Sequence, residues 1–245
     1  MSGITYEPFL VALSYVISVF GSYVALQLAI SIPQARTWGA IIGSCIGAAT
    51  AVGGGAIWSM HFIGMNAANL GIPVAYDPVL TTFSLVVAIL APAIGLFIVG
   101  RGDGGVFNLP LGGVLTGLGV TLMHYTGMAA MIMPAKINYD PTLFTASIVI
   151  AIVASTVALW LAFNLRGNFQ RFGSAFVMGI AVCGMHYTGM FALRLEPTKD
   201  VITNTGIALS PANMAYMVFG ATAVILTLLL TYSMWKSQRT LTADL

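Results

Sequence analysis

Long apolar runs separated by short polar stretches follow one another through the whole 245-residue chain. Each run is about 20 residues or longer, which is the length that a helix needs to cross the hydrocarbon core of a bilayer. Prolines and charged residues fall at or near the ends of the runs. The pattern predicts an all-α membrane protein with seven transmembrane helices, over residues 8–32, 38–66, 79–100, 109–133, 142–164, 172–193 and 212–235.

The composition supports a lipid-embedded chain. Hydrophobic residues make up 58% of the sequence and charged residues only 7%, against roughly 25% charged residues in an ordinary soluble domain. The formal net charge of +2 is small and scattered, which argues against nucleic acid as a partner. Cys45 and Cys183 both lie inside apolar runs, so a disulfide framework is not expected.

The distribution of basic residues predicts the orientation of the helices. Arg36 is the first basic residue, so we expect no cleaved signal peptide and an N-terminus on the outer side. The outer side then holds Lys136, Arg194 and Lys199, mixed with acidic residues. The cytoplasmic side holds six basic residues, namely Arg36, Arg101, Arg166, Arg171, Lys236 and Arg239. Because short cytoplasmic loops carry an excess of Lys and Arg, the C-terminus is predicted to be cytoplasmic.

Two short motifs recur along the chain and define a repeat. A lead-in with an aromatic residue, an acid and a proline precedes the first, third and fifth helices as "TYEPFL" (5–10), "AYDPVL" (75–80) and "NYDPTL" (138–143). A hexamer lies near the end of the second, fourth and sixth helices, as "MHFIGM" (60–65) and twice as "MHYTGM" (123–128 and 185–190). The unit is a helix pair, present three times and followed by a seventh helix. An even number of crossings separates the copies, so the repeats run parallel and all three hexamers reach one side of the membrane, around a predicted pseudo-threefold axis.

The hexamers contain every histidine of the chain and six of its thirteen methionines. Residues four apart share one face of a helix, so each histidine projects together with the last methionine of its hexamer. Imidazole and thioether together suit Cu(I) and tolerate Cu(II), whereas zinc prefers thiolate, histidine or carboxylate. The sequence therefore predicts a copper site near the outer face, with the ligands His61, Met65, His124, Met128, His186 and Met190.

Several features of this site stay open at the level of sequence. One shared ion, two ions or three separate ions all fit the repeat, and Met60, Met123, Met185 or Cys183 could add ligands. A duplicated helix pair also inherits its packing residues, so the hexamer could hold the bundle together without any metal. The acids of the lead-ins, Glu7, Asp77 and Asp140, are expected to cap helix N-termini rather than to act in catalysis.

The sequence also bears on two further functions. A copper transporter would need ligands across the whole membrane, and the inner halves of these helices contain no histidine and no acid. A haem protein would use two histidines, or histidine and methionine, as axial ligands, which three equivalent sites suit poorly.

The three hexamers resemble the motif of the MHYT domain family, and the resemblance covers about residues 1–235. Two copies match the namesake motif in full, while the first carries Phe62 and Ile63 in place of Tyr and Thr. The resemblance implies a bacterial integral-membrane sensor of the inner membrane. It also implies copper bound by the histidines and methionines, and oxygen, carbon monoxide or nitric oxide as the stimulus.

Members of this family are usually fused to cytoplasmic output domains, including those that make or degrade cyclic di-GMP. We therefore expect residues 1–235 to form one sensor domain and residues 236–245 to open a cytoplasmic linker. No stretch of the chain resembles a motif for cyclising nucleotides or hydrolysing phosphodiesters, so no enzyme activity and no catalytic residues are expected within it. The expected partners are the lipid bilayer, an output domain and a diatomic gas; a homodimer is also compatible with the sequence.

Overall fold

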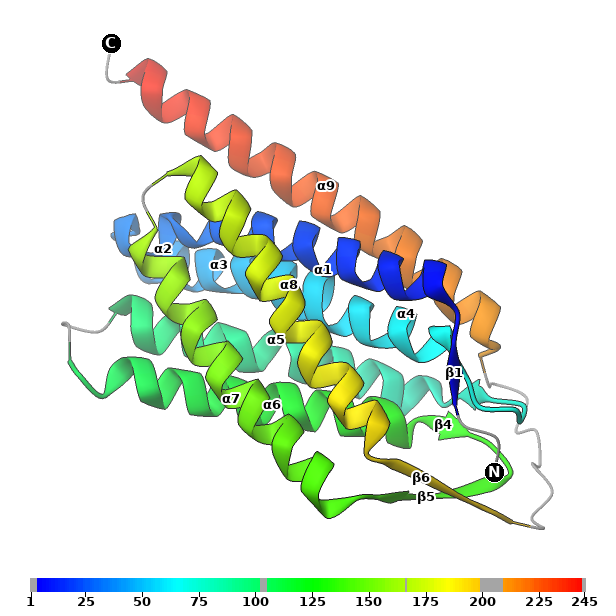
Figure 1. Cartoon of the computed structure of the whole chain (residues 1–245). Helices are drawn as coiled ribbons and strands as arrows, with labels where there is room; N and C mark the ends of the chain where they lie inside the picture. The colour runs from blue at the N-terminus through cyan, green and yellow to red at the C-terminus, as the bar shows by residue number, and fades with distance from the viewer. Residues whose placement is uncertain (1–3, 102–104, 166, 199–208, 244–245) are drawn as a thin grey trace.

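The computed structural model describes residues 4–101, 105–165, 167–198 and 209–243. Its helices are α1 (Pro8–Ala29), α2 (Ser31–Gln34), α3 (Trp38–Ala49), the π-helix η1 (Thr50–Trp58), α4 (Ser59–Ala67), α5 (Pro78–Arg101), α6 (Asn108–Ala129), α7 (Pro141–Asn164), α8 (Asn168–Phe191) and α9 (Pro211–Ala243). Six short strands connect some of them: β1 (Thr5–Tyr6), β2 (Ala68–Asn69), β3 (Ala75–Tyr76), β4 (Met131–Ile132), β5 (Ala135–Tyr139) and β6 (Leu193–Pro197). Figure 1 shows long helices lying roughly side by side, with the strands gathered at one end.

The predicted helix pair is the structural unit. The first pair is α1 with the continuous run α3–η1–α4, the second is α5 with α6, and the third is α7 with α8. A two-stranded antiparallel sheet closes the open end of each pair, because β1 pairs with β2, β3 with β4, and β5 with β6. The three hexamers consequently end at the same end of the bundle, as the repeat predicted.

The lead-in acids cap their helices as predicted. The Glu7 carboxylate accepts hydrogen bonds from the amides of Phe9 and Leu10, at 3.1 and 2.6 Å. Asp77 and Asp140 do the same at the start of α5 and α7. The backbone amides of the three acids also donate to carbonyls two residues beyond each hexamer, namely those of Ala67, Ala130 and Ala192. Each lead-in thus ties the start of one helix to the end of its hexamer helix.

The three pairs close into a ring of helices in which hexamer helices alternate with lead-in helices. Going round the ring, α1 packs on α8, α8 on α7, α7 on α6, α6 on α5, and α5 on α3 and η1, which return to α1. Helix α9 lies outside this ring against α1, η1 and α4. In Figure 1, α9 starts near the strands and runs past the opposite end of the bundle. This arrangement agrees with the predicted pseudo-threefold relation between the pairs.

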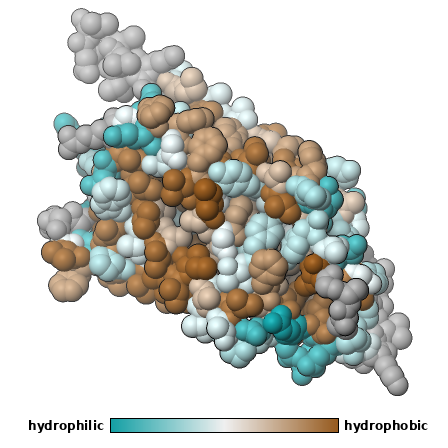
Figure 2. Space-filling view, viewed as in Figure 1, coloured by the Kyte–Doolittle hydropathy of each residue, from teal (hydrophilic) through white to brown (hydrophobic). Residues whose placement is uncertain are grey.

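Six of the helical spans are long and apolar enough to cross a membrane by length and composition: Pro8–Gln34, Trp38–Ala67, Pro78–Arg101, Pro141–Asn164, Asn168–Phe191 and Pro211–Trp235. The fourth predicted span, over 109–133, is not among these six; its helix α6 is 22 residues long but less apolar, because glycines and threonines interrupt its leucines and valines. Many large apolar side chains on the described surface are exposed, including Phe9 (70%), Val79 (74%) and Leu228 (64%). Figure 2 shows apolar residues over much of one face, with polar residues towards its ends. The chain is therefore a multi-pass membrane protein.

Several of the predicted helices need correction, and the last, expected over 212–235, continues as α9 to Ala243. Residues 8–32 were expected to form one helix, but α1 ends at Ala29 and a short helix, α2, follows it. The helix expected over 109–133 ends at Ala129, because Met131 and Ile132 pair with β3 as strand β4. The helix expected over 38–66 is continuous but has a π-helical middle over Thr50–Trp58, where three consecutive glycines lower its preference for the regular α-helix.

Candidate metal centre

The three histidines of the hexamers meet at the centre of the bundle. His61 comes from α4, His124 from α6 and His186 from α8, and each side chain is only 1% exposed. Nδ1 of His61 lies 3.0 Å from Nδ1 of His124 and 3.1 Å from Nδ1 of His186. The ring centroids are 4.8, 5.1 and 5.2 Å apart. The sequence left one, two or three sites open, and the structure brings the histidines together into a single cluster.

The glycine of each hexamer makes room for the histidine of the next repeat. The position that a Cβ would occupy on Gly127 is taken by Nε2 of His61, that on Gly189 by Nε2 of His124, and that on Gly64 by Nε2 of His186. Each imidazole therefore lies against the backbone of the neighbouring hexamer helix, and the contacts run once around the ring of repeats. Any residue larger than glycine would force the ring away from the centre.

A second set of contacts runs around the ring in the same direction and uses serines of the lead-in helices. Tyr125 of α6 bonds the hydroxyl of Ser147 on α7 at 2.7 Å, and Tyr187 of α8 bonds that of Ser14 on α1 at 3.1 Å. Each serine donates its own proton to a carbonyl three residues earlier in its helix, so the tyrosine is the donor between helices. The hydroxyls of both tyrosines therefore join neighbouring repeats.

The first repeat keeps this contact although it has lost the tyrosine. Phe62 cannot donate a hydrogen bond, but Trp58, one turn earlier in the same helical run, donates its indole N–H to Ser84 on α5 at 3.0 Å. Ser14, Ser84 and Ser147 each stand six residues after the proline of their lead-in. Sequence reasoning missed these serines, although that constant offset was visible.

We expect the Tyr125–Ser147 hydrogen bond to contribute about 1 kcal/mol to the free energy of unfolding. Tyr125→Phe and Ser147→Ala should each lower it by about that amount, and the double variant should cost little more than either single one. Thermal unfolding in detergent measures the effect. Additive losses in the double variant would show that the two hydroxyls act independently.

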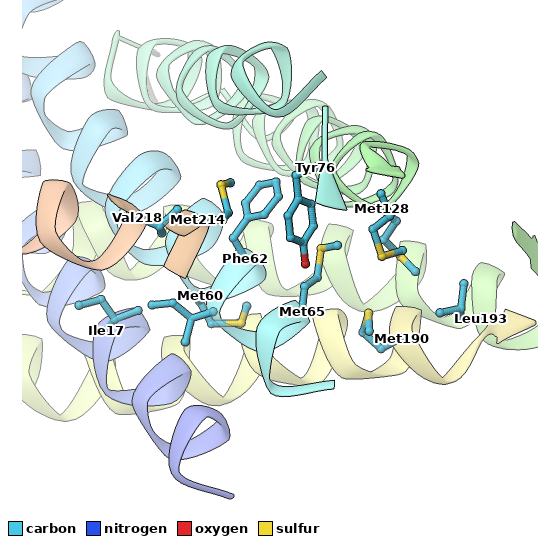
Figure 3. Packing of buried hydrophobic residues seen from close by; sticks show 12 residues of the cluster. Ile17, Met60, Phe62, Met65, Tyr76, Met128, Met190, Leu193, Met214 and Val218 are labelled. Carbon is cyan, nitrogen blue, oxygen red and sulfur yellow. The ribbon is translucent and has the colours of Figure 1, made fainter. Parts of the chain in front are cut away.

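The six methionines of the hexamers separate into two layers around the histidines. Met60, Met123 and Met185 line a cavity together with the three histidines. The last methionines of the hexamers, Met65, Met128 and Met190, stand four residues after the histidines in their helices, which places them about 6 Å nearer the strands than the histidines. Figure 3 shows these three in one buried cluster with Phe62, Tyr76 and Leu193. Thioethers are thus available on both sides of the imidazole layer.

Buried tyrosines complete the cover at the strand end. Burial raises the pKa of Tyr6 and Tyr139 to about 12, with smaller contributions from Tyr187 and Tyr125 respectively. Burial also raises the pKa of Tyr76, which is 2% exposed. These phenols therefore remain neutral at physiological pH, and they add no negative charge beside the histidines.

The cluster has the chemistry of a metal site. Two nitrogen ligands about 2.0 Å from one metal at a tetrahedral angle are roughly 3.3 Å apart, close to the observed Nδ1 spacings. Three neutral imidazoles cannot provide hydrogen-bond partners for all of their ring nitrogens, because each ring carries a single N–H. Their Nε2 atoms have no hydrogen-bond partner within the part of the chain that the structure describes. The ligand atoms of His61, His124 and His186 lie within 4.8 Å of one another, so the triad could hold a metal ion. Cys183 is not part of this group, and both cysteines are free.

The fold and the cluster define a class: a multi-pass membrane protein built from repeated helix pairs around a buried histidine triad. The sequence profile of the MHYT family, described as "Bacterial signalling protein N terminal repeat", matches residues 54–111, 117–175 and 179–243. The chain belongs to this family, and the predicted resemblance is confirmed. The family repeat begins before each hexamer and includes the following lead-in helix, so it is offset by one helix from the structural pair and includes α9 in the third copy.

Signalling proteins from two bacteria are similar to the chain. It is 40% identical over 239 residues to the bifunctional diguanylate cyclase/cyclic di-GMP phosphodiesterase MucR of Pseudomonas aeruginosa, covering 96% of this chain and 34% of that protein. It is 35% identical to the signaling protein YkoW of Bacillus subtilis and 34% identical to the cyclic di-GMP phosphodiesterase NbdA of Pseudomonas aeruginosa. These matches cover 77% and 78% of this chain, and 24% and 25% of the relatives. The chain thus spans about a third or a quarter of the length of these relatives, and no solved structure matches it.

Proposed function

We propose that this chain is the sensory input domain of a bacterial inner-membrane signalling protein, with copper at the His61, His124 and His186 triad. The observation that carries the proposal is the convergence of three buried imidazoles from three repeats on one point. The stimulus is a diatomic gas (oxygen, carbon monoxide or nitric oxide) or the redox or copper status of the surroundings. The N-terminus lies outside and the C-terminus lies in the cytoplasm, where an output domain in a longer protein receives the signal.

The charge balance around the triad favours Cu(I) over a divalent ion. Three imidazoles and the nearby thioethers are neutral, and the cluster of potential ligands includes no carboxylate. A buried charge without a compensating partner is costly, and the cost rises steeply with the charge. A monovalent soft cation with nitrogen and thioether ligands therefore fits best. Met65, Met128 and Met190 are the proposed additional ligands at the strand end, and Met60, Met123 and Met185 are alternatives on the cavity side.

Helix α9 is the proposed route for the signal, because it contacts the hexamer helix of the first repeat next to the triad. The hydroxyl of Thr222 lies 2.5 Å from that of Ser59, two residues before His61. Ser59 also donates to the carbonyl of Gly54, inside the π-helix. Leu226 of α9 occupies the place where a Cβ on Gly55 would stand. π-Helical segments are frequent at functional sites and can change register, so η1 is the proposed bistable element between the triad and α9.

Cu(I) and Cu(II) prefer different coordination geometries, so a bound copper ion would pull on its histidine ligands differently in the two oxidation states. Movement of His61 after such a change at the copper ion would be passed through Ser59 and η1 to α9, which continues beyond the last predicted span as far as Ala243.

A chimaera tests this function: residues 1–243 of this chain would replace the matching segment of a MucR-like enzyme. Cyclic di-GMP turnover is then measured in membranes with copper added or chelated. A turnover rate that does not depend on copper in the chimaera would contradict the proposal.

Thr222→Val in this chimaera should separate sensing from binding. The substitution keeps the shape and removes the hydroxyl that bonds Ser59, so copper content should stay unchanged while the copper-dependent change in turnover falls at least about twofold. Thr227→Val is the matched control, since the Thr227 hydroxyl is exposed and bonds its own helix at Ala223. Equal effects of the two variants would rule out this route.

Two observations weigh against the alternative functions. A copper transporter needs ligands along a path, but beyond the histidines and Met60, Met123 and Met185 the cavity lining offers only the thioether of Met178 and the hydroxyls of Thr116 and Ser155. A haem needs a pocket of several hundred Å³, whereas this cavity holds about 80 Å³. Storage or transport of copper and haem binding are therefore less well supported than sensing.

A further inference from the structure

The cavity beside the histidine triad has features that the copper site does not require. It has a volume of about 80 Å³ and is bounded at one end by the three imidazoles and by Met60, Met123 and Met185. Its lining continues down the bundle, on α8 from His186 back to Met178 and on α7 from Ala151 to Ala162. At 1.5 Å per residue these stretches correspond to roughly 12 and 16 Å. The cavity therefore extends along the bundle, with the triad at the end nearer the strands.

The walls of the cavity are almost entirely hydrocarbon and sulfur. Beyond the histidines, Thr116 and Ser155 are the only polar residues among those that line it. Thr116 already donates to a carbonyl of α5, that of Ala91. A water molecule needs two to four polar partners to enter a buried site, and a cavity with apolar walls stays dry and accepts apolar guests. The space is thus suited to a small uncharged molecule and unsuited to an ion or a polar metabolite.

Small side chains separate the cavity from the lipid-facing side of α7 and α8. Ala154, Ala158 and Ala162 of α7 and Ala181 of α8 line the cavity, and all four are only half-buried. Their neighbour Val157 is 44% exposed on the outer face of α7. The wall of the cavity on α7 and α8 therefore includes four alanines, beside the larger side chains of Leu159 and Val182.

We propose that this cavity binds a small uncharged apolar molecule of two or three heavy atoms, which enters from the lipid between α7 and α8 and lies against Met60, Met123, Met185 and the three imidazoles. Apolar gases partition into lipid, so the bilayer rather than the water would deliver the ligand. The proposal that a ligand binds here is based on the shape and lining of the cavity and does not depend on the proposed function. Only the identification of its occupant with the stimulus rests on the proposed function.

Xenon is a suitable probe, because it occupies dry apolar cavities without hydrogen bonds or redox chemistry. The complete chain, freed of metal and held in lipid nanodiscs, would be titrated with xenon while the xenon-129 chemical shift and the methyl resonances of the methionines are followed. We expect saturable binding with shifts of the Met60, Met123 and Met185 methyl groups. Xenon shifts no greater than those of empty nanodiscs would overturn the proposal.

Ala158→Phe places a ring in the cavity wall and should weaken xenon binding at least tenfold. Val157→Phe adds the same ring to the adjacent lipid-facing position and should leave it unchanged. Ala154→Leu serves as a milder second variant if the Phe variant does not fold, and it should weaken binding severalfold. Equal binding by all variants would contradict the proposal. Xenon binding is measured in metal-free protein, so a failure to bind copper would refute the proposed metal site but not the proposed cavity ligand. A failure to bind xenon would likewise refute the cavity proposal but not the metal site.

Discussion

Replacing any one of His61, His124 or His186 with alanine is expected to remove nearly all of the bound metal, not one third of it. The three Nδ1 atoms lie in one cluster, so under the proposed function they would share a single ion. Four-ligand structural metal sites are worth about 10–16 kcal/mol, hence roughly 3 kcal/mol per ligand, and the loss of one ligand should weaken binding about 100-fold. Metal content by mass spectrometry after dialysis at a fixed chelator concentration measures the effect.

Cys183→Ser is the matched control for these variants. Cys183 lies one turn before His186 on α8 but outside the cluster of potential ligands, so its replacement should leave the metal content unchanged. A metal content that falls by one third in each histidine variant would instead indicate three independent sites. That result would contradict the single shared centre.

Gly189→Ala is expected to have a similarly large effect although it removes no ligand. The new methyl group would overlap Nε2 of His124, which lies against the Gly189 backbone. Overpacking of this kind costs typically 1–3 kcal/mol, and here the cheapest relief is rotation of the imidazole away from the triad. We expect metal affinity to fall at least tenfold, with the helical content retained.

Gly184→Ala provides the control on the same helix, because a Cβ at Gly184 meets nothing within 4 Å. Alanine is the better helix former, so this variant should bind metal normally and be equally stable or slightly more stable. The contrast separates the steric effect on His124 from the general effect of glycine replacement. Normal metal affinity in Gly189→Ala would show that the close contact between imidazole and glycine does not position the ligand.

The sequence predicted the elements of this fold better than their contacts. Apolar run length and proline positions placed the helices within about four residues, except that α9 continues to Ala243, eight residues beyond its predicted span. The acids before each proline were correctly expected as caps. The 62- and 63-residue spacing of the histidines required all three to reach one end of the bundle. These features depend on local chemistry and on the number of crossings, both of which a single sequence contains.

Contacts between repeats could not be predicted in the same way. The glycine of each hexamer is visible in the sequence, but the contact in which Gly127 accommodates His61 of another repeat is not. Nor did it show that Trp58 takes over the role of the missing tyrosine at Phe62, because the replacement comes from a different turn of the helix. The direction in which a ring of similar helices closes depends on packing between distant segments. A repeat motif in the sequence does not indicate this direction.

The division of the methionines is a related case. The spacing of four residues predicted that each histidine shares a face with Met65, Met128 or Met190. It could not reveal a cavity on the other side of the histidines, because that cavity results from alanines on α7 and α8 and from Met60, Met123 and Met185 together. Which methionine layer completes the coordination of copper therefore stays a prediction.

The most direct test of the shared copper centre is the copper content of the domain purified without oxygen, combined with X-ray absorption at the copper edge. The account predicts one copper ion per chain, in the monovalent state, with nitrogen ligands at about 2.0 Å and a sulfur contribution if the methionines take part. Three copper ions per chain, or a stable and correctly folded domain that retains no metal after copper loading, would contradict it.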